Sequence, residues 1–212
     1  MEKNDIFFNT KEEFSGSDLT FILSLCEKLF PAPKTAYITQ AKDVKEIPIV
    51  SYLDENVLKA FDRNKYGIGY ESEYENPSIR ITKQEGKGFI SIPLIKEDEY
   101  HLTKKMVLEL IENLDLKELS VSPVNFRSFN RRYRKNQRTA DFPGLYWLQY
   151  YGAEEFKRQG GKAILDNPYI EAQLIKDGVF IQVGDSPYDV HTTEGEERMI
   201  KANAAMPPVR ND

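Results

Sequence analysis

The side chains that could do chemistry in this sequence are two runs of acids, two histidines and one cysteine. The runs KEDE (96–99) and EGEE (194–197) gather carboxylates that could serve as general acids and bases or as metal ligands. Both runs stand beside predicted helix starts, where acidic side chains interact favourably with the helix dipole. We therefore interpret them as helix-end charges. An enzyme with a dispersed carboxylate site at Glu97–Glu99 or Glu194–Glu197 stays open as an alternative.

The other reactive residue types lack the spacing that catalysis or metal binding requires. His101 and His191 stand 90 positions apart, and one cysteine cannot form a structural zinc site. Cys26 falls on the apolar stripe of a predicted helix, which is typical of a buried small side chain. The run QGGKA (159–163) lacks the outer glycine and the hydroxyl of a phosphate-binding loop. We expect no enzyme activity, no cofactor and no metal.

An arginine-rich segment, residues 127–138, carries six basic side chains and no acid. Phe129 and Tyr133 alternate with these cations, a pattern that could bind phosphates or nucleic acid. Arginine and tyrosine are also frequent at protein interfaces, so the segment could instead be a protein-binding surface or a solvated loop. The rest of the chain carries 23 basic and 34 acidic residues, a charge of −11. This charge disfavours nucleic acid and favours a basic partner.

A second unusual segment follows directly. FPGLYWLQYYG, residues 142–152, contains five aromatic rings and the only tryptophan of the chain. Its large side chains fall on both faces of a strand, with Trp147 and Tyr151 on one face and Tyr150 on the other. Two interpretations remain open: a central strand that is covered on both faces, or a strand with one face offered to a partner.

Composition and length favour one soluble domain over residues 1–212. The chain has 40% hydrophobic and 30% charged residues, and its apolar runs are much shorter than the roughly 18 residues that span a bilayer. Its first residues do not resemble a signal peptide, and one cysteine permits no intrachain disulfide. We expect a cytoplasmic protein without membrane contact.

The elements that must position these residues can be read from periodicity and end signals. Helices are predicted after Ser17, after Asp54, from Thr103, and from Thr193, where Glu196 completes a capping box. Hairpins are predicted in SIRITKQEGKGFISIPL and in YIEAQLIKDGVFIQVG, the second turning at Asp177-Gly178. KTAYIT, KELSVSPV and LYWLQYY are further strands. The pattern predicts an α+β fold, a mainly antiparallel sheet of hairpins with helices packed on it.

The order of these features resembles the immunity protein 52 family of bacterial polymorphic-toxin systems, over most of residues 6–206. In that family a Gly-Trp strand with a following tyrosine precedes a Gly-led apolar strand, and a helix with an Ala-Asn pair closes the domain. The corresponding residues here are Gly144, Trp147 and Tyr150, then Gly178 to Val183, then Ala202 and Asn203. Two residues separate Gly144 from Trp147, where the family more often has them adjacent. Related type VI secretion immunity families share this layout.

The resemblance implies a non-enzymatic inhibitor that binds and blocks a cognate toxin, a restriction-endonuclease-like nuclease, in the producing cell. An acidic inhibitor could cover the basic surface with which a nuclease holds DNA. We expect Trp147, Tyr150 and Tyr151 to be anchors of the contact, with a polar rim formed by Arg131, Arg132 and Arg134. The alternative is a module that binds nucleic acid or a phosphate ligand through residues 127–138.

Overall fold

Contacts between residues divide the chain into two compact units, Met1–Asp115 and Leu116–Asp212. Compact units within a chain are not by themselves independently folding domains, so the single domain stays a prediction. The structure, a computed structural model, describes residues 3–12, 14–30, 33–40, 43–47, 67–72, 78–84, 87–93, 100–123, 144–187, 189 and 192–209.

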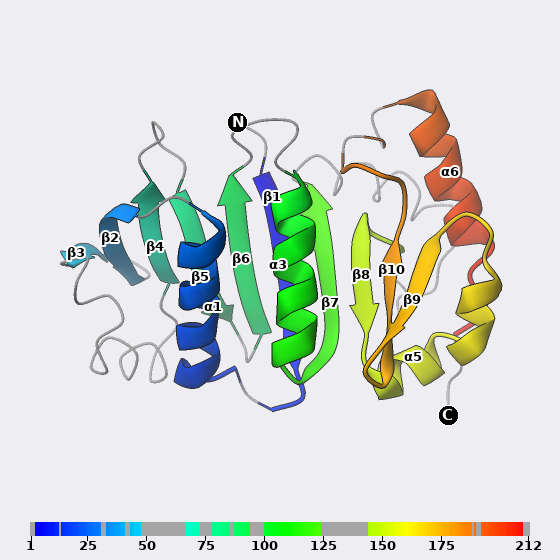
Figure 1. Cartoon of the computed structure of the whole chain (residues 1–212), viewed down its shortest axis with the longest axis horizontal. Coiled ribbons are helices and arrows are strands. Elements are labelled where there is room, and N and C mark those ends of the chain that lie inside the picture. Colours follow the sequence, from blue (N-terminus) through cyan, green and yellow to red (C-terminus); the bar gives the residue numbers. More distant parts are fainter. Residues whose placement is uncertain are drawn as a thin grey trace. The chain divides into compact units, whose positions relative to one another are not determined.

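In the first unit, the described strands form an antiparallel arrangement in the order β3-β2-β4-β5-β6-β1 (Figure 1). Each neighbouring pair in this order is antiparallel. The predicted hairpin is confirmed, since Ile81 of β5 lies opposite Ile90 of β6. The strands are β1 (Lys3–Thr10), β2 (Pro33–Gln40), β3 (Asp43–Ile47), β4 (Gly67–Ser72), β5 (Ser78–Gln84) and β6 (Lys87–Pro93).

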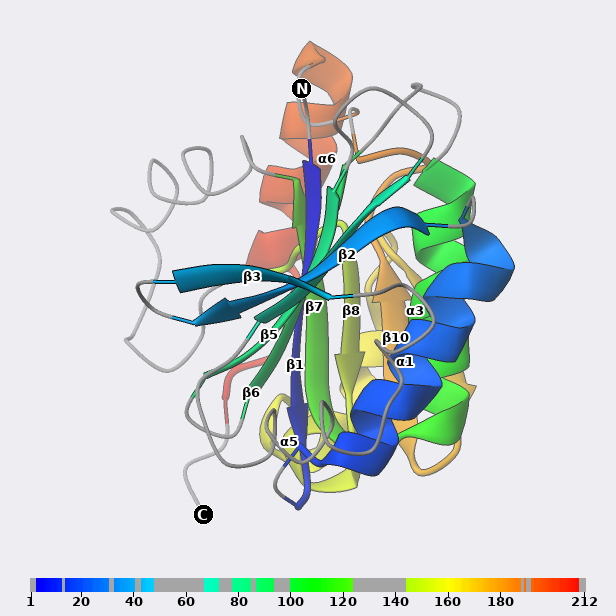
Figure 2. The ribbon, with the colours of Figure 1, turned by 90° about the vertical axis from the view of Figure 1, so that its left-hand side faces the viewer.

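Two helices, α1 (Gly16–Leu29) and α3 (Tyr100–Asn113), cover one face of these strands (Figure 2). Side chains of a strand alternate between faces, so Asn4, Ile6 and Phe8 of β1 share one of them. Asn4 Nδ2 donates to Thr103 Oγ1 of α3 at 3.1 Å, which identifies that face as the one toward the helices. The helices contribute fully buried side chains at helical spacing: Leu19, Ile22, Leu23, Cys26, Met106, Val107, Leu110 and Ile111.

The N-cap of the first helix lies two residues before the predicted cap, Ser17. Ser15 is the N-cap because its hydroxyl accepts from Asp18 N at 3.3 Å, while its own N–H donates to Asp18 Oδ2 at 2.9 Å. This reciprocal pair is a capping box, and it needs an acceptor three residues after the cap. Asp18 supplies that acceptor for Ser15.

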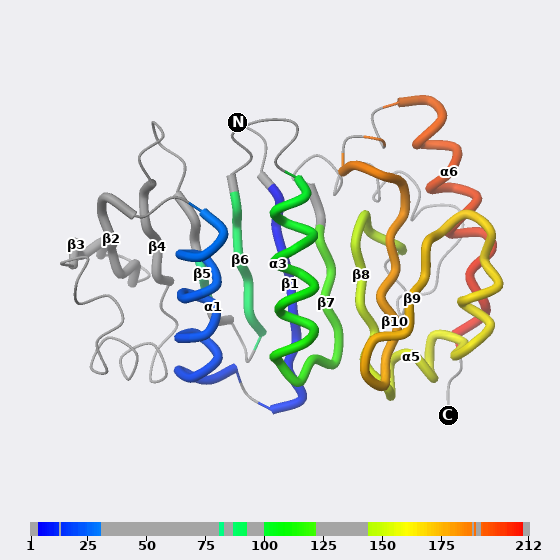
Figure 3. The backbone as a smooth tube through the Cα atoms, in the orientation of Figure 1, coloured from blue at the N-terminus to red at the C-terminus, as the bar shows by residue number. Residues whose placement is uncertain are grey.

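The second unit builds its sheet in the order β7-β8-β10-β9, again with antiparallel pairs (Figure 3). The turn of its hairpin lies one residue before the predicted Asp177-Gly178, because Gly178 already belongs to the strand and Lys176 adopts a φ of 54°. Its elements are β7 (Leu116–Pro123), β8 (Leu148–Tyr151), α5 (Ala153–Arg158), the 3-10 helix η3 (Gly161–Asp166), β9 (Glu171–Ile175), β10 (Gly178–Gln182) and α6 (Thr193–Ala204).

The fold is therefore α+β, with mainly antiparallel strands and helices packed on them, as predicted. The helix predicted from Thr193 is confirmed, but the predicted capping box of Thr193 and Glu196 is wrong: the N-cap is Thr192, whose hydroxyl accepts from Gly195 N at 3.0 Å. The helix predicted after Asp54 lies outside the described residues. No helix in the described part of the chain is long and apolar enough to cross a membrane.

Candidate functional site

The ring-rich segment enters its strand through a backbone clamp. Gly144 has a φ of 102°, a conformation that favours glycine, and the N–H of Leu145 donates to Asn203 Oδ1 of α6 at 2.9 Å. Asn203 Nδ2 in turn donates to Met199 O at 2.8 Å. Leu145 and Asn203, which stand 58 positions apart, thus fix one junction. Within this segment, pairing with neighbouring strands begins at Leu148, the first residue of β8.

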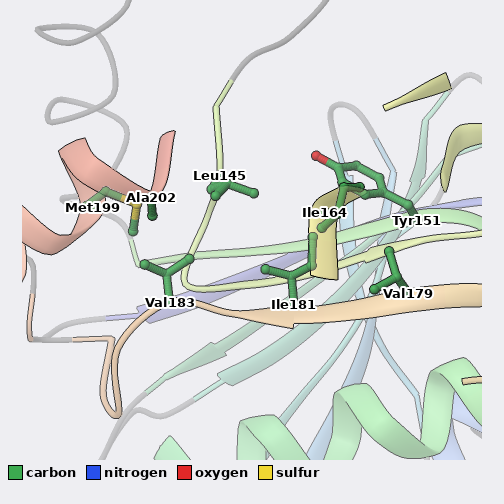
Figure 4. Packing of buried hydrophobic residues seen from close by; sticks show 8 residues of the cluster. All are labelled: Leu145, Tyr151, Ile164, Val179, Ile181, Val183, Met199 and Ala202. Carbon is green, nitrogen blue, oxygen red and sulfur yellow. The ribbon is translucent and has the colours of Figure 1, made fainter. Parts of the chain in front are cut away.

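One face of β8 and β10 packs into a closed apolar cluster (Figure 4). Val179 and Ile181 of β10 point to the same side as Tyr151, because Val179 lies opposite Tyr151 in the ladder. α6 and η3 cover this side with Met199, Ala202 and Ile164, the first two pointing toward Val183 and Leu145 in Figure 4. The cluster comprises Leu145, Tyr151, Ile164, Val179, Ile181, Val183, Met199 and Ala202.

The opposite face of the same strands is also buried. Tyr150 lies between Leu119 of β7 and Phe180 of β10 in the ladder, and all three are at most 5% exposed. Gly178 leaves room for this ring: a Cβ there would lie 2.6 Å from Tyr150 Oη and would overlap the carbonyl oxygen of Tyr151. Only glycine fits at this close approach.

The three rings expected as partner anchors are therefore interior side chains. Trp147, Tyr150 and Tyr151 are 0%, 2% and 2% exposed. A side chain this deeply buried has no surface to offer in this conformation, so the burial disfavours direct contact, and the role of these rings as anchors stays a prediction. Of the two interpretations left open by the sequence, the strand covered on both faces agrees with this burial.

The remaining candidates are either structural or outside the described residues. Cys26 is fully buried, as expected, and Glu194 and Glu196 lie in the first turn of α6. His101 is an exposed residue of α3. No group of three potential metal ligands exists within the described ranges. Outside those ranges lie the arginine-rich segment with the rim residues Arg131, Arg132 and Arg134, the run Glu97–Glu99, and His191.

A different surface emerges at the edge of the second unit. Among the residues whose side-chain burial the structure describes, which leaves out β2, β3 and β4, the exposed large hydrophobic side chains fall within ten positions: Leu165 at 38%, Tyr169 at 40% and Leu174 at 51%. They belong to η3, to β9 and to the turn between them, and η3 contacts β9. We call Leu165, Tyr169 and Leu174 the edge patch. Sequence reasoning missed it, because exposure at β9 depends on the strand order.

Beside the edge patch lies a cavity of about 230 Å³ with charged walls. Its lining includes two acidic residues, Glu171 and Asp185, and one basic residue, Arg198 of α6. The remaining walls are Pro168, Tyr169, Ile170 and Gly184. The cavity is thus lined by one aromatic residue, two acidic residues and one basic residue, and it lies at the first residue of β9.

The loop that forms one wall of this cavity is held by Asp189. Its Oδ2 accepts from Asp185 N at 2.7 Å and from Ser186 N at 3.3 Å. Gly184 has a φ of 78°, and a Cβ there would lie 2.6 Å from the same oxygen. Asp189 is thus occupied in shaping the loop, and Asp185 is left exposed at the cavity.

One ionisable group of this unit has a perturbed pKa. Burial opposes the charged form of Glu155, but hydrogen bonds from Arg158 and Gln159 and the charge of Arg158 outweigh it and lower the pKa. Arg158 donates from Nε at 2.8 Å and from Nη2 at 2.7 Å, and Gln159 Nε2 donates at 2.6 Å. The group stabilises α5 and takes no part in the cavity.

Comparisons with known proteins identify no relative. No family model matches the chain, and no curated protein matches it. Among solved structures, the AdoMetDC-delta26 monomer of Trypanosoma brucei matches with a TM-score of 0.28 and 11% identity. The match covers 86% of this chain and 63% of that one, so the chain spans less than two thirds of that protein. A likeness this weak carries no conclusion about activity.

Proposed function

We propose that this protein is a non-enzymatic immunity protein that binds a cognate bacterial toxin and blocks it by occlusion. The observation that carries the proposal is the edge patch, three exposed large hydrophobic side chains within ten positions at β9 and the segment before it. Exposed apolar side chains that gather in one region with a polar surround can mark protein-binding surfaces. The resemblance to the immunity protein 52 family supplies the class of partner.

Charge supports the same class of partner. Residues 144–209 carry ten acidic and six basic side chains, a formal charge of −4 within a chain of net charge −5. A nuclease is basic where it holds DNA, so an acidic protein is attracted to that surface and can cover it. We propose a restriction-endonuclease-like nuclease as the toxin and the cytoplasm of the producing cell as the place of inhibition.

Titration against the toxic domain encoded beside this gene tests the proposal. We expect one-to-one binding with a Kd on the order of nanomolar and complete loss of nuclease activity at equimolar ratio. The matched control is a toxic nuclease domain from an unrelated system, which this protein should leave active. A folded preparation that neither binds nor inhibits the neighbouring toxin would overturn the proposed function.

A further inference from the structure

β9 is the last strand in the sheet order of the second unit, and in the described structure it pairs with β10 alone. The N–H of Val183 donates to Trp147 O at 2.9 Å, on the side of β10 toward β8. Because hydrogen-bonding direction alternates along a strand, Gln182, Phe180 and Gly178 bond toward β9. Their partners in the ladder are Glu171, Gln173 and Ile175.

The alternation leaves the backbone groups of two residues of β9 directed away from β10. These are Ala172 and Leu174, which lie between the bonded positions. The two-residue turn at Lys176 and Asp177 requires the same register, because the residues that flank such a turn form a hydrogen-bonded pair. β9 therefore presents two N–H and two C=O groups along its outer edge, the groups to which an extended peptide can add as a further strand.

Side chains at this edge match a peptide that adds to it. Leu174 is half exposed on the strand, and Tyr169 and Leu165 extend the apolar surface from the preceding segment. The charged cavity lies at the other end of β9. Its lining has two acidic residues, Glu171 and Asp185, and one basic residue, Arg198. A peptide that runs along β9 therefore passes both an apolar surface and a cavity with an excess of negative charge.

Charge selects one occupant for this edge. A second copy of this chain would bring Glu171 and Asp185 toward the same two acidic residues of its own cavity. A basic partner has the opposite sign. Resting on the proposed function, we propose that an extended segment of the toxin adds to the outer edge of β9 and places an arginine or lysine side chain in the cavity beside Glu171.

Amide hydrogen exchange tests strand addition directly, using the full chain alone and in complex with a catalytically inactive form of the toxic domain encoded beside this gene. The N–H groups of Ala172 and Leu174 should exchange rapidly in the free protein and become protected at least about tenfold in the complex. Those of Gln173 and Ile175 should already be protected in the free protein. Tight binding without new protection at Ala172 and Leu174 would overturn the inference.

Two substitutions and a control test the same edge by affinity. Ala172→Pro removes one outward N–H at an edge position that tolerates proline, and should weaken toxin binding about tenfold. Glu171→Lys reverses the cavity charge and should weaken binding by a similar factor. Glu154→Lys makes the same charge change at an exposed residue of α5 and should alter the Kd by less than about twofold.

The outcomes separate this inference from the proposed function. A wild-type protein that fails to bind the toxin overturns the proposed function. Wild-type binding that Ala172→Pro, Glu171→Lys and Glu154→Lys leave equally strong overturns strand addition at β9 alone. Circular dichroism and the melting temperature show whether each variant is folded. If Ala172→Pro does not fold, Glu171→Lys and the exchange data decide.

Discussion

Asn203 makes one hydrogen bond within its helix and one across the fold. Its Nδ2 donates to Met199 O, four residues earlier, and its Oδ1 accepts from the N–H of Leu145, a fully buried residue. Leaving a buried N–H without an acceptor costs more than losing a hydrogen bond to solvent. Asn203 therefore serves to place the ring-rich segment, and a partner is not needed to explain it.

Replacing Asn203 with alanine should show the cost of leaving the buried N–H of Leu145 without an acceptor. Asn203→Ala should lower the free energy of unfolding by about 1–3 kcal/mol, because Leu145 N–H loses its acceptor. The matched control is Asn113→Ala, since Asn113 Nδ2 makes the same local bond to Glu109 O at 2.8 Å on the exposed side of α3. Urea denaturation measures both. Equal losses for the two variants would contradict the long-range role.

Gly178 should be sensitive to a single methyl group. Gly178→Ala places a Cβ against Tyr150 Oη and the carbonyl oxygen of Tyr151, so overpacking should destabilise the protein by about 1–3 kcal/mol. Tyr150→Phe removes Tyr150 Oη, one of the three atoms that would lie within 3.0 Å of that Cβ, and should recover part of the loss in a double-mutant cycle. The control is Gly161→Ala, which meets no atom within 4 Å and should show no coupling to Tyr150→Phe. Absence of coupling at Gly178 would refute the packing argument.

At the scale of elements, β8 and β10 are structural and β9 is available. The first two strands bury side chains on both faces, whereas β9 exposes Glu171, Gln173 and Leu174. An edge strand must be protected against unwanted pairing, and charged residues such as Glu171 provide such protection. The same hairpin therefore joins a core strand to the edge strand at which we propose docking.

Helix α5 should contribute a pH-dependent part of the stability. The lowered pKa of Glu155 means that the fold favours its charged form, so its stabilisation is present above the ordinary value of 4.5 and is lost as pH falls through the lowered pKa. Glu155→Gln should destabilise the protein by less than about 1 kcal/mol at neutral pH, since Arg158 is partly exposed, and the difference should shrink below about pH 4.

Chemical denaturation at neutral and at acidic pH, on wild type and variant, measures this effect. Glu154→Gln is the control, because Glu154 is exposed on the same helix. It should change stability little at either pH. A Glu155→Gln difference that grows as pH falls would contradict a lowered pKa for Glu155.

For the whole molecule, net charge and the edge patch should affect different rate constants. The charge of −5 should accelerate association with the proposed basic toxin, so raising the salt from about 50 to about 500 mM should lower kon severalfold. Leu174→Ala removes half-exposed apolar surface and should mainly raise koff. Surface plasmon resonance separates the two. A kon that is independent of salt would show that net charge does not accelerate association.

The two compact units bear on cooperativity. Trp147, the only tryptophan, is buried in the second unit, so its fluorescence reports that unit while far-ultraviolet circular dichroism reports the whole chain. A single domain predicts coincident urea transitions for both signals. Two separate transitions would instead show that Met1–Asp115 and Leu116–Asp212 unfold independently.

Sequence alone determined the elements whose signals are local. Apolar side chains at helical spacing marked α1 and α3, and alternation around glycines marked both hairpins, because these patterns arise from the geometry of a single element. The α+β class followed from their order. Small errors of position arose where two nearby residues could both cap a helix. Ser17 was predicted as the N-cap of α1, and the structure has Ser15 there.

Only the tertiary structure decided which surfaces are covered. Trp147, Tyr150 and Tyr151 looked like anchors because their types are frequent at interfaces, yet all three are buried, Tyr151 in the cluster with α6 and η3 and Tyr150 between neighbouring strands. Leu174 and Glu171 attracted no notice in sequence, since exposure of β9 follows from its place at the end of the sheet order. Burial is a property of long-range pairing, and residue type and spacing report only what a strand can bury, not what lies against it.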